Sequence, residues 1–410
     1  MSGMTAQEVA ARLGVKLDTV YAYVSRGVLT ARGQPGSRRS VFDPQEVETL
    51  ARRGRPRRTS RPSALDLIVE TGLTTIVDQR IRYRGRDASA LARTHSFEEV
   101  ADWLWTGRDD VPVLGWEPYP MALPDELESA RDRMRVAVVI SSAAEPLRSD
   151  LSTPAMTASA RRLIASMAAA VPGASDARVA RLALVGDRPP IRASIAGLLW
   201  GRLAGGRPTP GLVAALNAAL VLLADHELAS STVTARVAAS VRADPFSVVL
   251  AGLGSIAGPL HAGASALVHR MIEDATTADP ATALATALET HRHLPGFGHR
   301  LYSDGDPRAA VLLDMIQTTA PTARGLRAAR ALIDAAHRHS EVRPNIDFAL
   351  GALSTTAHMP ATAGETIFTI ARAAGWIAHA IEEYTEPPLR FRARAIPKPA
   401  DNGNPDQQKD

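Results

Sequence analysis

The chain has 410 residues, of which 45% are apolar and 22% are charged, and it contains no cysteine. This composition is typical of a globular protein of two or three domains, and the lack of cysteine excludes a disulfide framework, a thiol nucleophile and a thiolate metal site. No run of about 18 apolar residues is free of charges or helix breakers, and no signal peptide is recognisable, so we expect no membrane span and a cytoplasmic location.

Positive charge is concentrated in the first part of the chain. Residues 1–63 contain 12 Lys and Arg against 5 Asp and Glu, whereas the remaining residues contain 35 against 38. A polyanionic partner such as nucleic acid is therefore suggested only for the N-terminal region.

Two short helices are expected at the N-terminus. Thr5 and Glu8 have the spacing of a capping box at the start of a helix that ends at Gly14. A second helix is expected from Leu17 to Arg26. Two short helices around a glycine turn are typical of a helix-turn-helix motif.

A small winged element is expected next. Val28–Leu29 and Val41–Phe42 flank a basic, turn-rich stretch and predict a two-stranded wing, and Asp43 and Pro44 are suited to begin a third helix. Residues 1–53 thus resemble the excisionase/MerR-type winged helix-turn-helix family. Residues 54–63, rich in Arg and helix breakers, are interpreted as a flexible basic linker.

The resemblance implies possible DNA binding, with the second helix in the major groove and the wing on the phosphates. The residues expected to meet DNA are Thr19, Tyr21, Arg26, Arg38 and Arg39. A single module makes few phosphate contacts, so useful affinity requires a dimer. The alternatives are a degenerate or protein-binding module, or one that serves dimerisation or solubility.

The rest of the chain is predicted to be mainly helical. The alternating pattern of Ile76–Gly85 predicts a small β-hairpin. Ser96 is the expected N-cap of a helix whose Trp103 and Trp105 are expected in the core. From about residue 125 to 257, apolar residues recur at three- and four-residue spacing between glycine and proline breaks. The fold class is therefore mainly α with a minor hairpin.

Five short motifs interrupt the later helices. They read ADHEL (224–228), GPLHAG (258–263), PGFGHR (295–300), GDPRA (305–309) and PNIDF (344–348). Each places a histidine, an arginine or an aspartate in a break between apolar helical segments, where functional side chains are usually mounted. In this order and at these intervals the motifs resemble the citrate synthase family, and the resemblance extends over residues 66–396.

The resemblance implies a two-domain multihelical fold. The large domain would comprise residues 64–263 and 363–396, and the small domain, residues 264–362, would close over the substrates. A homodimer with a shared active site is also implied. Residues 397–410 are polar, contain Pro and Gly, and are expected to be disordered.

The activity that the resemblance implies is condensation of acetyl-CoA with oxaloacetate, with acetyl-CoA as a substrate and without a cofactor or metal. Asp347 matches the base, His261 the group that stabilises the enol, and His299 the acid that polarises the ketone. A carboxylate can deprotonate a thioester methyl group only when a preorganised donor meets the forming enolate oxygen. The residues that match substrate-binding groups are His226, Arg308, Arg372 and Arg392, which would reach over from the partner subunit and has Arg394 as its alternative. The residues that match coenzyme A binding are Pro295, Gly296, Phe297, Gly298 and Arg300.

The chain departs from the usual family motifs at Ala229, Ala262, Ser265 and Ser303. Many members carry Lys or Arg at the position of Ser303, where the side chain can meet coenzyme A phosphates. Affinity for coenzyme A and the preference among acyl groups therefore stay open.

Two other functions are compatible with the same motifs. A 2-methylcitrate synthase would use propionyl-CoA on the same residues, because one methylene discriminates by only about 10–200-fold in an apolar pocket. A DNA-binding regulator would use the enzyme body as a sensor of oxaloacetate or acyl-CoA. A sensor needs ligand-binding arginines but has no need for the base Asp347, which favours the enzyme.

Overall fold

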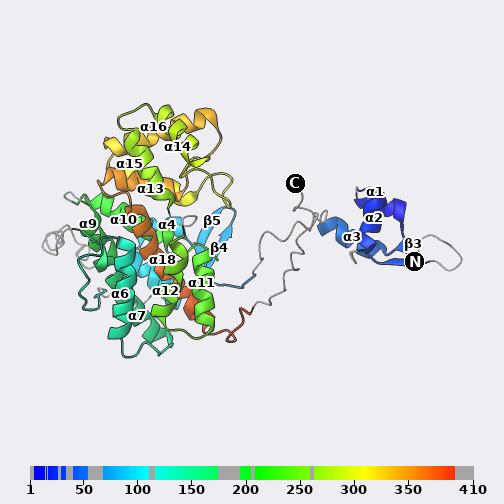
Figure 1. Ribbon diagram of the computed structural model, residues 1–410, viewed down its shortest axis with the longest axis horizontal. Helices are drawn as coiled ribbons and strands as arrows, with labels where there is room; N and C mark the ends of the chain where they lie inside the picture. The colour runs from blue at the N-terminus through cyan, green and yellow to red at the C-terminus, as the bar shows by residue number, and fades with distance from the viewer. Residues whose placement is uncertain are drawn as a thin grey trace, which may run out of the picture. The chain divides into compact units, whose positions relative to one another are not determined.

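The computed structural model describes residues 4–13, 15, 17–25, 29–33, 40–53, 68–109, 116–173, 194–204, 208–258 and 263–392. The chain divides into two compact units, Met1–Glu70 and Thr71–Asp410 (Figure 1). The predicted linker at 54–63, the tip of the predicted wing, the tail at 397–410 and His261 lie outside the described residues. The division of the second unit into a large and a small domain stays a prediction.

The first unit is a small module of three helices and three strands within its described residues. Its elements are β1 (Met4–Thr5), α1 (Ala6–Leu13), α2 (Leu17–Ser25), β2 (Ala31–Gly33), β3 (Ser40–Phe42) and α3 (Pro44–Arg53). β3 lies between β1 and β2 in an antiparallel sheet, so that Phe42 is opposite both Met4 and Ala31. The helices cover this sheet with buried side chains such as Val9 and Val20.

The predicted capping box is confirmed. Thr5 N–H donates to Glu8 Oε2 at 2.7 Å, and Glu8 N–H donates to Thr5 Oγ1 at 3.3 Å. The predicted start of the third helix is confirmed as well, because the Asp43 carboxylate accepts from Gln45 N–H at 2.9 Å. These signals act over two or three residues, which is why the sequence alone reveals them.

The predicted wing was wrong in two respects. Leu29 is a buried core residue and not part of a strand, and the first strand of the wing begins only at Ala31. A third strand, β1, pairs with β3. Two residues are too few to show the alternation that marks a strand, so this pairing carried no sequence signal.

The second unit is mainly helical. Its strands are β4 (Thr74–Val77), β5 (Arg80–Tyr83) and β6 (Arg86–Asp87). Its helices are α4 (Ala88–Thr94), α5 (Phe97–Thr106), α6 (Ala130–Ala144), α7 (Thr153–Ala170), α9 (Ile195–Leu203), α10 (Pro210–Leu223), α11 (Ser230–Ser240), α12 (Pro245–Ile256), α13 (Ala264–Asp274), α14 (Pro280–His291), α15 (Pro307–Thr319), α16 (Arg324–His339), α17 (Ile346–Thr356) and α18 (Ala363–Glu383). None of the described helices is long and apolar enough to cross a membrane.

The predicted hairpin is confirmed. β4 and β5 are antiparallel with Ile76 opposite Ile81, and β6 extends the sheet and continues directly into α4. The two turn residues, Asp78 and Gln79, have φ angles of 49° and 60°. Positive φ at both positions is the geometry of a two-residue turn whose twist matches that of the strands.

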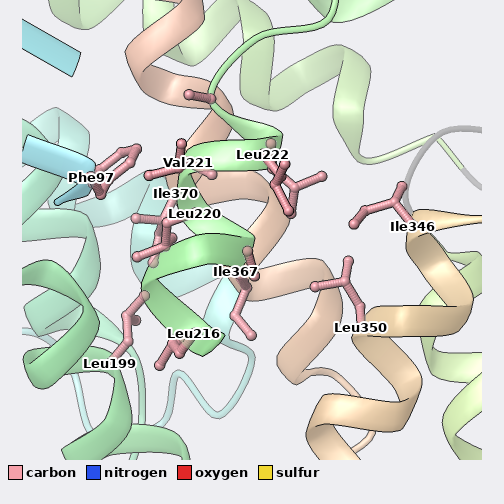
Figure 2. Packing of buried hydrophobic residues seen from close by; sticks show 14 of the residues in the cluster. Phe97, Leu199, Leu216, Leu220, Val221, Leu222, Ile346, Leu350, Ile367 and Ile370 are labelled. Atoms are coloured by element: carbon pink, nitrogen blue, oxygen red, sulfur yellow. The ribbon is translucent and has the colours of Figure 1, made fainter. Parts of the chain in front are cut away.

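α10 and α18 form the centre of the core of this unit. Every residue from Ala218 to Leu223 is buried, as expected of a helix that is apolar on all sides. Figure 2 shows Leu220 of α10 close to Ile370 of α18, and Ile367 of α18 on the side that faces Leu350 of α17. Because α10, α17 and α18 pack against one another, the ends of α10 and α17 are held in place beside α18.

The helix predicted after Ser96 is confirmed with its capping box, since Glu99 N–H donates to Ser96 Oγ at 3.2 Å. Trp105 is buried, and its indole N–H donates to a main-chain carbonyl of α18 at 2.9 Å. Trp103 is only partly buried, and the Arg86 guanidinium lies 3.8 Å from its ring centre. The core prediction is therefore confirmed for Trp105 and wrong for Trp103.

Candidate active site

Ionisable side chains from four of the five motifs meet beside the ends of α10, α15 and α17. His226 follows α10, His299 ends the glycine-rich turn, and Arg308 and Asp347 lie in the first turns of α15 and α17. The ring centres of His226 and His299 are 5.5 Å apart, and Arg308 Nη2 is 3.3 Å from His299 Nε2. The charge of Arg308 also acts on Asp347. These groups therefore share one electrostatic environment.

The glycine-rich turn before His299 pairs with the segment before α17. Gly298 N–H donates to Arg343 O, and Asn345 N–H donates to Gly296 O, both at 2.8 Å. This short two-way pairing joins two motifs that are about 50 residues apart in sequence and holds them side by side.

Asn345 then links the turn to α17. Its side-chain amide donates to Gly298 O at 2.8 Å, and its side-chain carbonyl oxygen accepts from Asp347 N–H at 3.0 Å as the helix N-cap. Gly296 has a φ of +78°, and a Cβ atom there would lie 2.5 Å from Val268. Only glycine allows this close approach.

Arg308 is buried and forms a two-pronged ion pair with Asp306, the N-cap of α15. The Nε–Oδ1 distance is 3.0 Å and the Nη2–Oδ2 distance is 2.9 Å, while Asp306 also accepts from Ile346 N–H at 2.9 Å. Burial acts to raise the pKa of Asp306, but the charge and hydrogen bonds of Arg308 bring this pKa below its usual value. Both groups are therefore ionised, and their geometry is fixed.

His299 is neutral in this setting. Burial lowers the pKa of His299, and the positive charge of Arg308 lowers it further. Leu301 N–H donates to His299 Nδ1 at 3.1 Å, and Arg308 Nη2, which can only donate, lies 3.3 Å from Nε2. Both ring nitrogens therefore face donors, and a carbonyl or carboxylate oxygen that separates Arg308 Nη2 from Nε2 would let Nε2 carry the ring proton and donate it.

His226 is also neutral. Burial depresses the pKa of His226 far below its usual value, and the charges of Arg308 and Arg372 add to this effect. Its Nε2 lies 2.8 Å from the hydroxyl group of Tyr302. The buried Tyr302 ring has its centre 4.5 Å from that of His299 and 5.8 Å from that of His226, so the three rings contact one another beside Arg308.

Asp347 is a partly buried carboxylate with raised basicity. Burial raises the pKa of Asp347 to about 6, against the opposing charge of Arg308. Among the described residues, none donates a hydrogen bond to its carboxylate. A carboxylate of this kind is suited to accept a proton from a ligand at neutral pH.

Arg372 reaches the same region from α18. Its side chain is buried, and Nε donates to Leu223 O at 2.9 Å at the end of α10. Burial lowers the pKa of Arg372, and the buried carboxylate of Asp225 opposes that shift. Arg372 and Arg308 thus supply two positive charges beside the histidines.

A cavity of about 320 Å³ opens next to this cluster. It is lined by residues of segments 298–306 and 340–344, including His299, Tyr302, Glu341 and Arg343. Of the residues matched to coenzyme A binding, only Gly298 lines this cavity. In the described parts of the chain, no group of three or more His, Asp or Glu residues is arranged to hold a metal ion.

The structure brings together most of the site residues inferred from sequence. His226, His299, Arg308, Arg372 and Asp347 are in one cluster, and Pro295, Gly296, Phe297 and Gly298 form the adjoining turn. Arg300 and Arg392 are exposed, and no hydrogen bond or ion pair joins either of them to another described residue. Thr19 and Tyr21 are on α2, whereas His261, Arg26, Arg38 and Arg39 lie outside the described residues.

Tyr302, Asp306 and Asp225 were missed as site residues. From the sequence, Asp306 is recognisable only as a helix N-cap. Its ion pair with Arg308 forms because the Arg308 side chain folds back toward the N-terminus of α15, which the sequence does not reveal. Asp225 adjoins His226 in a motif but acts from a fully buried position. Tyr302 has no sequence signal, because a lone tyrosine in a loop has many uses.

Comparisons with known proteins cover both units. Residues 66–394 match the family model described as Citrate synthase, C-terminal domain, and residues 4–55 match one described as Helix-turn-helix domain. Citrate synthase 2 of Bacillus subtilis is 30% identical over 359 residues, which cover 83% of this chain and 94% of the relative. A 2-methylcitrate synthase of Mycobacterium tuberculosis H37Rv is 30% identical over 342 residues, covering 77% and 84%. The crystal structure of citrate synthase from Thermotoga maritima matches with a TM-score of 0.64 at 25% identity, over 84% of this chain and 97% of that chain.

Proposed function

Because the chain belongs to the citrate synthase family, we propose that it condenses acetyl-CoA with oxaloacetate to give citrate and CoA. The observation that carries this proposal is the partly buried Asp347 carboxylate under the charge of the buried Arg308, whose Nη2 atom is 3.3 Å from the neutral His299. The reaction requires a base for the acyl methyl group and, next to it, a site that binds a ketone with negatively charged carboxylates.

The first step is removal of a proton from the acyl methyl group. Asp347 takes this proton, and the electron pair moves onto the thioester oxygen. The pKa of about 6 makes Asp347 a stronger base than an ordinary carboxylate while leaving it ionised at pH 7. We assign the hydrogen bond to the enolate oxygen to His261 from its position in the family motif.

The second step is attack of the enol carbon on the ketone of oxaloacetate. The two carboxylates of oxaloacetate would bind Arg308 and Arg372, whose guanidinium forks suit bidentate pairing, with His226 as a further donor or acceptor. His299 would donate its Nε2 proton to the ketone oxygen as negative charge develops there. A neutral imidazole is the favoured donor beside Arg308, because a second positive charge is disfavoured. Water then hydrolyses the thioester and releases citrate and CoA.

The test is release of the CoA thiol from acetyl-CoA in the presence of oxaloacetate. The chain contains no cysteine, so the protein adds no thiol background. We expect turnover by the wild type and a fall in kcat of about 10²–10⁴-fold in Asp347→Asn, the contribution typical of a general base. Asp314→Asn, at an exposed ion pair with Arg93, is the matched control. A folded wild type without turnover on any short acyl-CoA would contradict the proposal.

The acyl group is the open part of this proposal. Curated relatives at 30% identity include both a citrate synthase and a 2-methylcitrate synthase. The same assay with propionyl-CoA measures the preference, for which a ratio of about 10–200-fold is expected in either direction. A higher kcat/KM for propionyl-CoA would assign the chain to the second activity.

We also propose that the active species is a homodimer in which Arg392 enters the active site of the partner. Its support is that Arg392 is exposed and is not hydrogen-bonded or ion-paired to any other described residue. Mixing inactive Asp347→Asn with inactive Arg392→Ala protein, after subunit exchange, should restore activity. Restoration occurs only when one heterodimer site contains both intact residues; a mixture that stays inactive contradicts the shared site.

For residues 4–55 we propose DNA binding through α2. The matching helix-turn-helix domain model supports this, as does the exposure of Tyr21 on the face of α2 opposite the buried Val20 and Tyr23. A gel shift with the full chain at two salt concentrations tests it. The logarithm of the binding constant falls linearly with the logarithm of the salt concentration, by about 0.9 per phosphate contact. Replacing Arg38 and Arg39 with Gln should therefore reduce this slope by roughly two. Salt-independent binding, or none, excludes the proposal.

A metabolite-sensing regulator is the second candidate function. It is favoured because one chain matches both the helix-turn-helix model and the citrate synthase model. The Asp347→Asn variant distinguishes the enzyme from the sensor. An enzyme loses turnover in this variant, whereas a sensor keeps its response of DNA binding to oxaloacetate or acyl-CoA.

A further inference from the structure

The β4–β5 hairpin supports one wall of the substrate site. Thr74 Oγ1 of β4 donates to Asp225 Oδ2 at 2.5 Å, and the Glu227 carboxylate is hydrogen-bonded to the main chain at Ile76. These two contacts bracket His226, the residue between Asp225 and Glu227. The hairpin therefore fixes the turn that presents His226.

The tip of the same hairpin reaches the opposite wall. We call residues 299–306 the histidine loop. Gln79 Nε2 donates to Asp304 Oδ2 at 2.7 Å, and Asp304 N–H donates to Gln79 Oε1 at 2.9 Å. One amide group thus makes two reciprocal hydrogen bonds to a residue 225 positions away in sequence.

Apart from the buried Tyr302, whose hydroxyl group lies 2.8 Å from His226 Nε2, the histidine loop has few other supports. Its two ends are tied by the turn bonds of Gly298 and by the contacts of Asp306. Between them, at residues 299–305, the bond from Asp304 to Gln79 is the only main-chain N–H bond to another element among the described residues. The loop carries both His299 and Tyr302, so its position decides how these groups face His226.

We propose that Gln79 is a positioning residue that holds the histidine loop through Asp304 and thereby sets the affinity for the keto-acid substrate. This inference deepens the proposed function and rests on it. Gln79 lies outside the cluster of reacting groups, so its loss should affect binding of oxaloacetate more than the chemical step. Both partners are at least partly exposed, and the folded core does not depend on them.

The first variant is Gln79→Ala. We expect the KM for oxaloacetate to rise about five- to thirtyfold, the effect of losing one or two hydrogen bonds, with kcat within about threefold of the wild type. Thr75→Ala is the matched control, because Thr75 is exposed on the same hairpin and its side chain makes no hydrogen bond within the described structure. It should leave both constants unchanged.

The second test exchanges the partners. Gln79→Glu places a carboxylate against Asp304 and should raise the KM for oxaloacetate at least as much as Gln79→Ala. The double variant Gln79→Glu with Asp304→Asn restores both hydrogen bonds, since the new amide donates to the new carboxylate and the main-chain N–H is retained. We expect its KM to return to within about threefold of the wild type.

Calorimetric titration of oxaloacetate into the Asp347→Asn background separates this inference from the proposed function. If the wild type binds oxaloacetate but does not turn over, the proposed function is contradicted. The dissociation constants of the Gln79 variants for oxaloacetate then still test whether Gln79 sets the affinity through the histidine loop. An unchanged KM and dissociation constant in Gln79→Ala, or a double variant as weak as Gln79→Glu, overturns the inference. A wild type that does not bind oxaloacetate overturns both.

Discussion

His379 Nε2 lies 3.2 Å from Asp225 Oδ2 at a place where both side chains are fully buried. On the other side of the ring, Arg236 Nη1 lies 2.8 Å from His379 Nδ1. A guanidinium group only donates, so Nδ1 accepts and the ring proton is on Nε2, directed at Asp225. Arg236 continues the network to Glu383 at 2.9 Å. The turn that presents His226 is therefore anchored in a buried charge network.

The first prediction concerns the anchor of this network. Burial acts to raise the pKa of Asp225, but His379 and Arg372 outweigh it and the pKa falls below its usual value. A depressed carboxyl pKa adds stability at every pH above the unfolded value of about 3.9, and this stability is lost as pH falls through the folded pKa. Asp225→Asn should lower the free energy of unfolding at pH 7 by about 2–5 kcal/mol.

Urea unfolding of the full chain checks this value. Asp132→Asn removes an exposed carboxylate that pairs with Arg135 at 3.2 Å, and it should cost less than about 1 kcal/mol. An Asp225→Asn protein as stable as this control would mean that the network does not depend on its charge.

The second prediction concerns the geometry of the central cation. Arg236 is fully buried and donates to three acceptors, Glu383, Glu382 and His379, at 2.6–2.9 Å. Arg236→Lys keeps the charge but replaces a planar fork with a single ammonium group. We expect a loss of about 2–4 kcal/mol in the free energy of unfolding, because at least one buried acceptor loses its donor. Arg135→Lys at the exposed pair should be neutral, and equal stabilities of the two variants would contradict the argument.

The third prediction is a pH dependence. Burial raises the pKa of Asp347 to about 6, and the proposed base is its carboxylate form. The logarithm of kcat/KM should therefore fall with unit slope as pH decreases below about 6. A rate constant that is flat between pH 5 and 8 would remove Asp347 from the role of base.

The same shift predicts a cost in stability. A raised carboxyl pKa contributes stability below the unfolded value, and this contribution is lost as pH rises through the folded pKa. At pH 8 the ionised Asp347 opposes folding, so Asp347→Asn should be more stable than the wild type, by on the order of 1 kcal/mol after allowance for solvent that reaches the group. The difference should shrink at pH 4, and thermal unfolding at both pH values measures it.

Local features of this protein were predictable because their causes are local. Capping at Thr5 and Ser96 depends on residues three positions apart, and α10 is recognisable as buried because it is apolar on every side. The clustering of His226, His299 and Asp347 was inferred only from resemblance to a family. Their spacing along the chain does not by itself predict that three loops converge.

The missed features depend on contacts between distant segments. His379 meets Asp225 across 154 positions, and Gln79 meets Asp304 across 225. Neither pair has a local pattern, because the residues are common polar types whose partners are chosen by the packing of α10 and α18 or by the reach of the hairpin. Tyr302 is of the same kind, since its hydroxyl group meets His226 across 76 positions.

The last prediction concerns the proposed binding site for the substrate carboxylates. Arg308 uses Nε and Nη2 for Asp306, at 3.0 and 2.9 Å, and Nη2 also faces His299 at 3.3 Å. Arg308→Lys retains the charge, but one ammonium group cannot hold Asp306 and also present a second donor beside His299. We expect the dissociation constant for oxaloacetate to rise about 10–100-fold, the loss of one or two charge-assisted hydrogen bonds.

Calorimetric titration measures this constant directly and does not require turnover. Arg93→Lys, at an exposed pair with Asp314, is the matched control and should bind oxaloacetate as the wild type does. Asp306→Asn adds a second check, since it leaves Arg308 charged but without its partner and should weaken binding through loss of position. If Arg308→Lys binds as tightly as the wild type, the carboxylates of the substrate do not lie against Arg308, and Arg372 becomes the main anion-binding group.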